Sequence, residues 1–195
     1  LPGGTTIFIS NPNNPAGYTP TTEAVEEIKN ILLECAEAGN QLVVFLDDAY
    51  FGLVFKEGIY KESLFALLAN LHENLLAIKI DGVTKEDYAW GLRVGFITYG
   101  IKNGTEELYK ALEAKTAGAV RGNISNTCHL SQTLVLKSFL SPEYDTEKEV
   151  KYKLLKRRFD EVNNILNTHG EYKKYFEALP FNSGYFMCVK LKELD

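Results

Sequence analysis

The sequence is poor in several residue patterns, and each shortage excludes a class of protein. Its 195 residues include three cysteines that form no CxxC pair, so no disulfide framework is predicted. No apolar run approaches the ~20 residues that a membrane-spanning helix needs, and no signal peptide opens the chain. The net charge of −5 provides no basic surface for nucleic acid. We therefore expect a cytoplasmic protein that binds neither membrane nor nucleic acid.

Methionine is almost absent as well. The only one is Met187, and the chain begins with Leu1. A strand predicted at residues 5–10 already lies close to the first residue, and the last residues directly follow a strand predicted at residues 185–191. We therefore predict that the chain is an internal piece of a longer protein, or a processed product, cut at both ends.

The remaining composition is that of a globular protein, with 45% hydrophobic and 24% charged residues. The length suits one large domain, or one domain and part of another. Cys128 and His129 are adjacent, but neither has partners at the spacing of metal ligands, so no metal site is predicted.

Short apolar strands alternate with helices in the first hundred residues. Strands are predicted at residues 5–10, 41–46, 75–80 and 93–99, with a short helix at 63–71. A longer helix is predicted to begin at Pro20, with Thr19 as its N-cap, and to end before Gly39. The almost wholly apolar run at 41–46 is typical of a parallel strand that is buried on both faces. This alternation predicts a layered α/β domain.

The chain becomes helical after Gly104. Helices are predicted at residues 105–120 and 125–140, and a long charged helix begins at Ser141-Pro142. Its charged face, which includes Lys148, is predicted to be a solvated surface. This change of pattern predicts a domain boundary near residue 140. Residues 1–140 would belong to a large domain, and residues 141–195 would form an interdomain helix and the start of a small C-terminal domain.

Polar residues follow three of the predicted strands. Asn14 follows the first strand, Asp47 follows the second, and residues 81–85 follow the third. Ligands bind at the carboxyl ends of strands in open α/β sheets. The sequence therefore predicts a crevice lined by asparagine, aspartate and lysine.

Three motifs occur in order at these strand ends. They are NPNNPAG at residues 11–17, DDAY at residues 47–50, and Lys85 followed eight residues later by Arg93 within GLRVG. This ordered set resembles the fold-type I pyridoxal-phosphate (PLP) enzymes, specifically the class I/II aminotransferase family. The resemblance covers the middle and later part of the family pattern. It implies a PLP-dependent transferase-like α/β fold, with a mostly parallel sheet in the large PLP-binding domain.

The resemblance implies a role for each of five residues at these strand ends. Lys85 would hold pyridoxal 5'-phosphate as an imine and, once displaced, shuttle a proton. Asp47 would keep the pyridine nitrogen protonated, so that the cofactor acts as an electron sink. Tyr50 and Asn14 would hydrogen-bond the phenolic oxygen. Arg93 would pair with the phosphate through two charge-assisted hydrogen bonds.

One position departs from the family pattern. A serine is usual three residues before the lysine, where this chain has Gly82. Gly82 offers the phosphate only its backbone N–H, whereas Thr84 keeps the hydroxyl group that directly precedes Lys85. We therefore expect Thr84 to add its hydroxyl to phosphate binding, while the side-chain contact usual at position 82 is missing.

A further resemblance concerns subunit assembly. The segment RGNISN at residues 121–126 is similar to the family segment in which an arginine precedes a Ser-Asn pair and projects into the neighbouring subunit's site. Arg121 would then receive the distal carboxylate of a dicarboxylic substrate. The alternative is an ordinary interface or surface arginine. The resemblance also implies a homodimer, and it gives Tyr185 no catalytic role.

The resemblance predicts an aminotransferase that acts on an amino acid and a 2-keto acid. PLP-dependent lyases and decarboxylases share the same cofactor residues, so they remain alternatives. So does the aminotransferase-like effector domain of a transcription regulator, and, with less support, a non-catalytic scaffold. In the family, the glycine-rich phosphate loop lies upstream of this segment, and the arginine for the substrate α-carboxylate lies downstream. We therefore expect this chain alone to be inactive.

Overall fold

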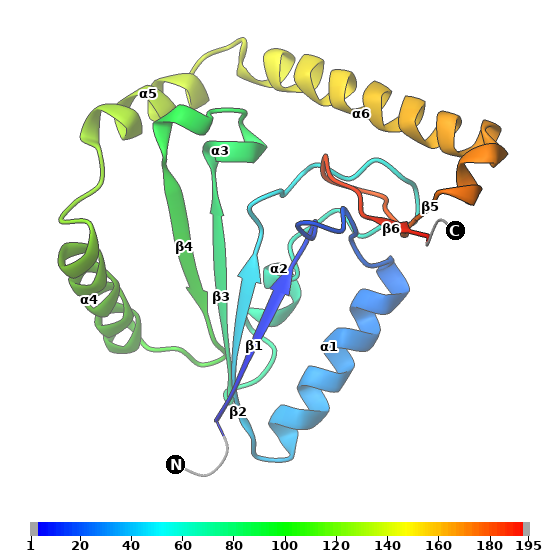
Figure 1. The fold of residues 1–195 in the computed structure, drawn as a ribbon. Helices are drawn as coiled ribbons and strands as arrows, with labels where there is room; N and C mark the ends of the chain where they lie inside the picture. The colour runs from blue at the N-terminus through cyan, green and yellow to red at the C-terminus, as the bar shows by residue number, and fades with distance from the viewer. Residues whose placement is uncertain (1–3, 193–195) are drawn as a thin grey trace.

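The computed structural model describes residues 4–192, and its centre is a four-stranded sheet (Figure 1). Strands β1 (Gly4–Ser10), β2 (Gln41–Asp47), β3 (Leu75–Gly82) and β4 (Gly95–Gly100) lie side by side in sequence order. The first three strands are parallel, and β4 is antiparallel to β3. The expected α/β fold with a mostly parallel sheet is confirmed. The ends of the two predicted domains, residues 1–3 and 193–195, lie outside the described residues.

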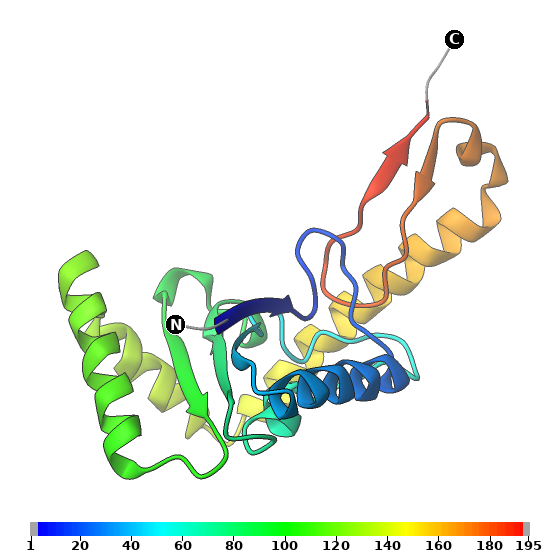
Figure 2. The ribbon, with the colours of Figure 1, turned by 90° about the horizontal axis from the view of Figure 1, so that it is seen from below.

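The two faces of this sheet are covered differently. Helices α1 (Thr22–Glu37) and α2 (Phe65–Leu68) pack on one face; Figure 2 shows α1 on one side of the strands. The core there is made of alternate residues of β2 and β3, namely Leu42, Val44, Leu46, Leu75 and Ala77. On the other face Phe8 is 75% exposed and stacks on Phe45. The prediction that residues 41–46 are buried on both faces is therefore wrong.

Helix α1 begins two residues later than predicted. Thr21 is its N-cap and accepts a hydrogen bond from the N–H of Ala24 at 3.2 Å. Thr19 is instead buried, and its backbone N–H donates to the Asn182 side chain at 2.9 Å. A tertiary contact with the far end of the chain thus overrides the local capping signal.

The connection from β3 to β4 carries the lysine region. It consists of the single-turn helix α3 (Val83–Glu86) and the 3₁₀ turn η1 (Trp90–Leu92). β4 begins at Gly95, two residues later than predicted, because Arg93 adopts a left-handed backbone conformation with φ of 53°.

The second half of the described chain is mainly helical. Helix α4 (Glu106–Asn123) lies beside β4, α5 (His129–Phe139) follows it, and α6 (Tyr144–Thr168) runs across the carboxyl ends of the strands (Figure 1). Beyond the 3₁₀ turn η2 (Gly170–Lys174), strands β5 (Phe176–Ala178) and β6 (Val189–Leu191) form a separate antiparallel sheet. Between residues 4 and 192, no helix has the length and apolar character needed to cross a membrane.

The last strand is shorter than predicted. Residues 185–188 lie outside β6, because the preceding segment is bonded elsewhere. The N–H of Gly184 donates to the carbonyl of Leu53 at 2.7 Å, and those of Asn182 and Ser183 donate to the carbonyl of Gly17 at 2.8 and 3.0 Å. This segment therefore connects the two polar turns that follow β1 and β2.

Candidate functional site

The carboxyl ends of the three parallel strands meet at one edge of the sheet. The register aligns Ser10 with Asp47 and Asp47 with Ile80. Beyond the strands, the N–H of Asn11 donates to the carbonyl of Asp47 at 3.2 Å, and that of Asp48 donates to Ile80 at 2.9 Å. The residues predicted to form a crevice therefore start from one common edge.

Two neighbouring aspartates at the end of β2 have opposite environments. Asp47 is exposed on the open face of the sheet, where it accepts hydrogen bonds from the Ala49 N–H at 3.1 Å and the Ser10 hydroxyl at 3.4 Å. Asp48 is 4% exposed on the helix-covered face and accepts a hydrogen bond from the Ser63 hydroxyl at 2.5 Å. Burial raises the pKa of Asp48 to about 6. Asp47 is thus the carboxylate that is accessible to a ligand.

Lys85 and Tyr50 come together above this edge. The Nζ atom of Lys85 lies 4.8 Å from the centroid of the Tyr50 ring. Tyr50 is only 6% exposed, and the rings of Tyr185 and Phe186 pack edge-on to it at 5.3 Å each. The phenol is therefore held rigidly beside the lysine amine.

Thr84 and Arg93 flank one backbone contact in the β3–β4 connection. The N–H of Val83 donates to the carbonyl of Val94 at 3.3 Å, and Gly82 pairs with Gly95. The Arg93 side chain is exposed and Thr84 is half-buried. The structure thus places Thr84 in α3 and Arg93 directly after η1, on the two sides of this contact.

The same contact explains the glycine at position 82. A Cβ atom at Gly82 would lie 2.6 Å from the carbonyl oxygen of Val94 and 2.8 Å from Cα of Gly95. Both are backbone atoms of the paired strand, so they have little room to move. A serine side chain does not fit at this position in the observed conformation.

The Asn14 turn is fixed by the C-terminal segment. Gly17, with φ of 67°, approaches so closely that a Cβ atom there would lie 2.0 Å from the carbonyl oxygen of Phe186. Asn14 is exposed, and its side chain makes no hydrogen bond to another residue in the range 4–192. Asn14 therefore follows β1 at the edge that carries Asp47, and no hydrogen bond joins the two side chains within residues 4–192.

Arg121 is not part of this cluster within the chain. It lies in the last turn of α4, beside β4, and its guanidinium donates to the Ser125 hydroxyl at 2.7 Å. It is exposed. Within residues 4–192, no hydrogen bond or ion pair joins Arg121 to Lys85.

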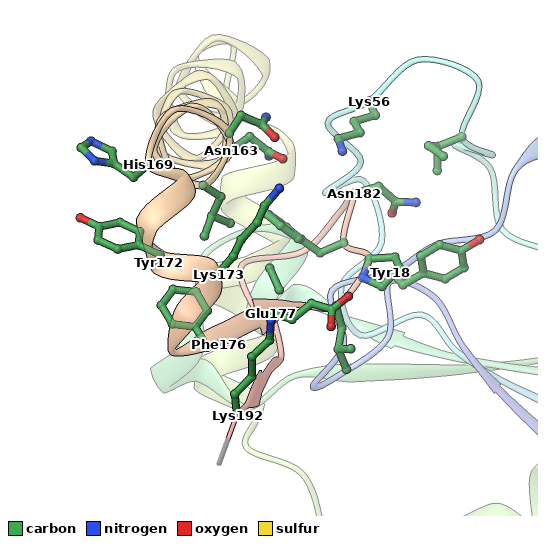
Figure 3. A pocket seen from close by; sticks show the side chains of 17 residues that line it. Tyr18, Lys56, Asn163, His169, Tyr172, Lys173, Phe176, Glu177, Asn182 and Lys192 are labelled. Carbon is green, nitrogen blue, oxygen red and sulfur yellow. The ribbon is translucent and has the colours of Figure 1, made fainter. Parts of the chain in front are cut away.

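A cavity of about 660 Å³ lies elsewhere in the molecule (Figure 3). It is open to solvent on one side and is lined by the end of α6, η2, β5 and the loop that carries Lys56, with Lys173 and Asn182 among its lining residues. None of the residues predicted to bind the cofactor lines it. A smaller cavity of about 410 Å³ is lined by Trp90 and by Tyr185 and Phe186, the two residues whose rings pack on Tyr50.

The donor set at the strand ends fits PLP. In the described part of the chain, Lys85 and Arg93 form no ion pair with a carboxylate, and Asp47 forms none with a cation. The edge therefore presents a free amine, a guanidinium and a carboxylate to a ligand. These groups complement an aldehyde carbon, a phosphate and a protonated ring nitrogen.

Sequence reasoning missed residues that support this site. Phe186 lies beside Tyr185 in a segment that was predicted to be a strand, so its packing on Tyr50 was not foreseen. Lys148 was predicted to lie on a solvated helix face. The prediction holds for Glu147 and Lys151, which are exposed, but it is wrong for Lys148, which is half-buried. Its Nζ lies 3.1 Å from carboxylate oxygens of both Glu86 and Asp87, the residues that directly follow Lys85. No local signal in the sequence marks such a contact across about sixty residues.

Comparison with known proteins agrees with this arrangement. The family model of aminotransferase class I and II matches residues 2–195. A probable aspartate/prephenate aminotransferase of Rickettsia felis is 27% identical over 96% of this chain and 41% of its own length. The 1-aminocyclopropane-1-carboxylate synthase 7 of Arabidopsis thaliana is 29% identical over 95% of this chain and 38% of its own length.

A solved structure shows the same fold. The crystal structure of an aminotransferase from Anaerococcus prevotii superposes with a TM-score of 0.75 at 25% identity, covering 93% of this chain and 44% of that protein. The chain thus spans about two fifths of the length of the relatives that it matches.

Proposed function

This chain belongs to the aminotransferase class I and II family, and we propose that the protein is a PLP-dependent aminotransferase that moves an amino group between an amino acid and a 2-keto acid. Members of this family use pyridoxal 5'-phosphate. The observation that supports the proposal most strongly is the position of the Lys85 amine over the Tyr50 ring, at the strand edge that carries Asp47.

Each side chain at this edge has a task that follows from its chemistry. When bound here, PLP would supply an electron sink for a carbanion next to its ring. The Asp47 carboxylate would keep the ring nitrogen protonated. Lys85 would hold the cofactor covalently through Nζ and, when free, would accept and return a proton at the substrate α-carbon.

The remaining polar residues would orient the cofactor. The Tyr50 hydroxyl and the Asn14 amide would donate hydrogen bonds to its phenolic oxygen. The Arg93 guanidinium would hold two phosphate oxygens at once, with the Thr84 hydroxyl beside it. Because Gly82 cannot carry a side chain, no third side-chain contact comes from that position.

We propose further that the protein is a cytoplasmic homodimer. Arg121 is exposed, and among the described residues its side chain is bonded only to Ser125, which leaves it available to a neighbouring subunit. In that position it would bind the distal carboxylate of a dicarboxylic substrate. Sedimentation of the protein, and activity of the Arg121→Ala variant with aspartate and with alanine, would test this. A selective loss with aspartate supports the assignment, and an equal loss contradicts it.

The reaction itself is tested by product analysis. Because this chain alone is expected to be inactive, the assay uses a protein in which it is joined to the remaining length of its relatives. That protein is incubated with PLP and an amino acid, with and without a 2-keto acid acceptor, and new amino acids are quantified. An aminotransferase needs the acceptor and forms its amino acid. The Lys85→Arg variant should lose the reaction, whereas Lys153→Arg, at an exposed lysine on α6, should not.

A lyase is the second candidate, because one relative is named 1-aminocyclopropane-1-carboxylate synthase. Such an enzyme eliminates a group from its substrate and needs no keto acid. Product formed equally fast without the acceptor would overturn the aminotransferase proposal in favour of a lyase.

A further inference from the structure

Two carboxylates directly follow Lys85, and one lysine from a distant helix holds both. The Nζ atom of Lys148, on α6, lies 3.1 Å from Oε1 of Glu86 and 3.1 Å from Oδ1 of Asp87. The Tyr144 hydroxyl donates to Asp87 and lies 3.2 Å from the same Nζ. We call these four residues, Glu86, Asp87, Tyr144 and Lys148, the Lys148 clamp.

The Lys148 clamp differs from the other ion pairs of α6. The pair of Lys153 with Glu149 joins residues four apart, with side chains 70% and 54% exposed. Such surface pairs contribute little. In the clamp, the Asp87 side chain is only 11% exposed, and the pairs join α6 to α3. Removing one partner from a partly buried pair leaves the other charge uncompensated, so the clamp restrains both elements.

Asp87 is the principal partner within the clamp. Burial by itself would lower the pKa of Lys148, but Asp87, Glu86 and Tyr144 together raise it above its ordinary value, so the ammonium is fully charged at neutral pH. Burial raises the pKa of Glu86 despite the nearby Lys148. Glu86 is thus the weaker partner, while Asp87 accepts hydrogen bonds from both Lys148 and Tyr144.

The segment that carries Lys85 needs such a restraint. Helix α3 has only four residues, and a single helical turn has little stability of its own. At its start, Val83 is fully buried and bonded to Val94. At its end, Glu86 and Asp87 are held to α6. Lys85 lies between these two anchors.

Helix α6 is also fixed to the loop that carries Tyr50. The Tyr152 hydroxyl donates to the carbonyl of Val54 at 2.7 Å, and the rings of Tyr152 and Phe159 pack on Phe55. Figure 1 shows α6 running across the strand ends above α3. One helix therefore holds both the lysine turn and the tyrosine loop.

We propose that Lys148 is a positioning residue, which fixes α3 against α6 and so holds the Lys85 amine over the Tyr50 ring in the place where it binds the cofactor. The proposal rests on the proposed function of Lys85. Within residues 4–192, Lys148 forms no hydrogen bond or ion pair with Lys85 or Tyr50. Its effect passes through the two carboxylates that follow Lys85 in the chain.

The first test needs no cofactor. Lysines of the protein are labelled with a small acylating reagent, and the rate at each site is followed by mass spectrometry. In the Lys148→Met variant, the released α3 turn should let Lys85 react about threefold or more faster, approaching the rate of the exposed Lys102. Lys148→Arg should restore the slow rate, because its guanidinium reaches both carboxylates. Lys153→Met is the matched control and should change nothing.

The second test uses PLP. At limiting PLP, borohydride reduction should give about tenfold less adduct at Lys85 in Lys148→Met than in the unchanged protein, because small misplacements of a reacting group cost rate. Lys148→Arg should recover most of it. Asp87→Asn, which removes the other half of the pair, should reproduce the loss, and it serves if Lys148→Met does not fold.

The outcomes separate the two proposals. An unchanged Lys85 labelling rate in a folded Lys148→Met or Asp87→Asn protein, with only thermal stability lowered, overturns the positioning role. If the unchanged protein forms no adduct at Lys85, the cofactor assignment fails, and the acylation rates still decide whether Lys148 positions the lysine turn.

Discussion

Both faces of the central sheet carry apolar side chains and an aspartate, but these residues are buried on one face and exposed on the other. On the helix-covered face, Leu75 and Ala77 are fully buried, and Asp48 is buried with Ser63. On the open face, Phe8 is exposed, and Asp47 points toward solvent at the strand edge. At the end of β2, Asp48 thus faces the core and Asp47 faces the proposed ligand site, because successive side chains along extended backbone point to opposite faces.

We expect stability and cofactor binding to depend on different faces of the sheet. Residues on the covered face should contribute most of the free energy of unfolding and little to cofactor binding. Residues at the strand ends of the open face should contribute little to the free energy of unfolding and most to cofactor binding. The variants below test that division, from the largest expected effect to the smallest.

The largest effect is expected from truncation of the covered core. Leu75→Ala truncates a fully buried β3 side chain in the covered core and should lower the free energy of unfolding by about 3 kcal/mol. Phe8→Ala, on the open face, should lower it by less than about 1 kcal/mol. Urea denaturation of both variants measures the two values. Equal losses would show that the open face is packed as tightly as the covered one.

The second effect concerns the buried carboxylate. Burial raises the pKa of Asp48 from 3.8 to about 6, so the folded protein holds the Asp48 proton more tightly than the unfolded chain does. The stabilisation that results from this difference is complete below pH 3.8 and is lost as pH rises through about 6. The two pKa values differ by about two pH units, which corresponds to about 3 kcal/mol at most. Asp48→Asn should remove this loss, since its amide oxygen still accepts from Ser63.

The measurement is urea denaturation at several pH values from 4 to 7. The stability of Asp48→Asn relative to the unchanged protein should increase by about 2–3 kcal/mol over this range. Asp47→Asn is the matched control on the open face. A parallel pH profile for Asp48→Asn and the unchanged protein would show that Asp48 does not titrate in this range.

A smaller loss is expected at the β3–β4 contact. Gly82→Ser adds a Cβ atom within 2.6 Å of the Val94 carbonyl oxygen and should lower the free energy of unfolding by about 1–3 kcal/mol. It should not increase the affinity for PLP, although it restores the residue usual in the family. Tighter PLP binding by a stable Gly82→Ser protein would mean that the two strands separate to admit the side chain.

The smallest effect on stability is expected at Asp47. Asp47→Asn should change the free energy of unfolding by less than about 0.5 kcal/mol, because the side chain is exposed. It should nevertheless weaken PLP retention by about tenfold, since the carboxylate would no longer stabilise the protonated ring nitrogen. Equilibrium dialysis with PLP measures the affinity. An unchanged affinity would remove Asp47 from the cofactor site.

Local patterns predicted the elements of this fold, and their failures have a common cause. The apolar runs located β1, β2 and β3 to within two residues at each end. The start of α1 and the extent of the last strand were wrong, because Thr19 forms hydrogen bonds with Asn182 and Ser183, more than 160 residues away. Tertiary contacts of this kind leave no local pattern.

The candidate site shows the same limit. Motif order alone placed Asp47, Tyr50 and Lys85 at strand ends, and the structure brings Lys85 onto Tyr50. The sequence did not reveal that Gly82 faces the Val94 backbone, or that Lys148 binds the turn after Lys85. Both depend on how β4 and α6 pack against α3.

The central claim is that Lys85 is the amine that holds the cofactor, and one measurement tests it most directly. The protein is incubated with PLP, reduced with borohydride and digested, and the modified lysine is identified by mass spectrometry. We expect the reduced PLP adduct on the peptide that contains Lys85, and no adduct on that peptide in the Lys85→Arg variant. An adduct confined to other lysines, or one that persists in Lys85→Arg at the same yield, would contradict it.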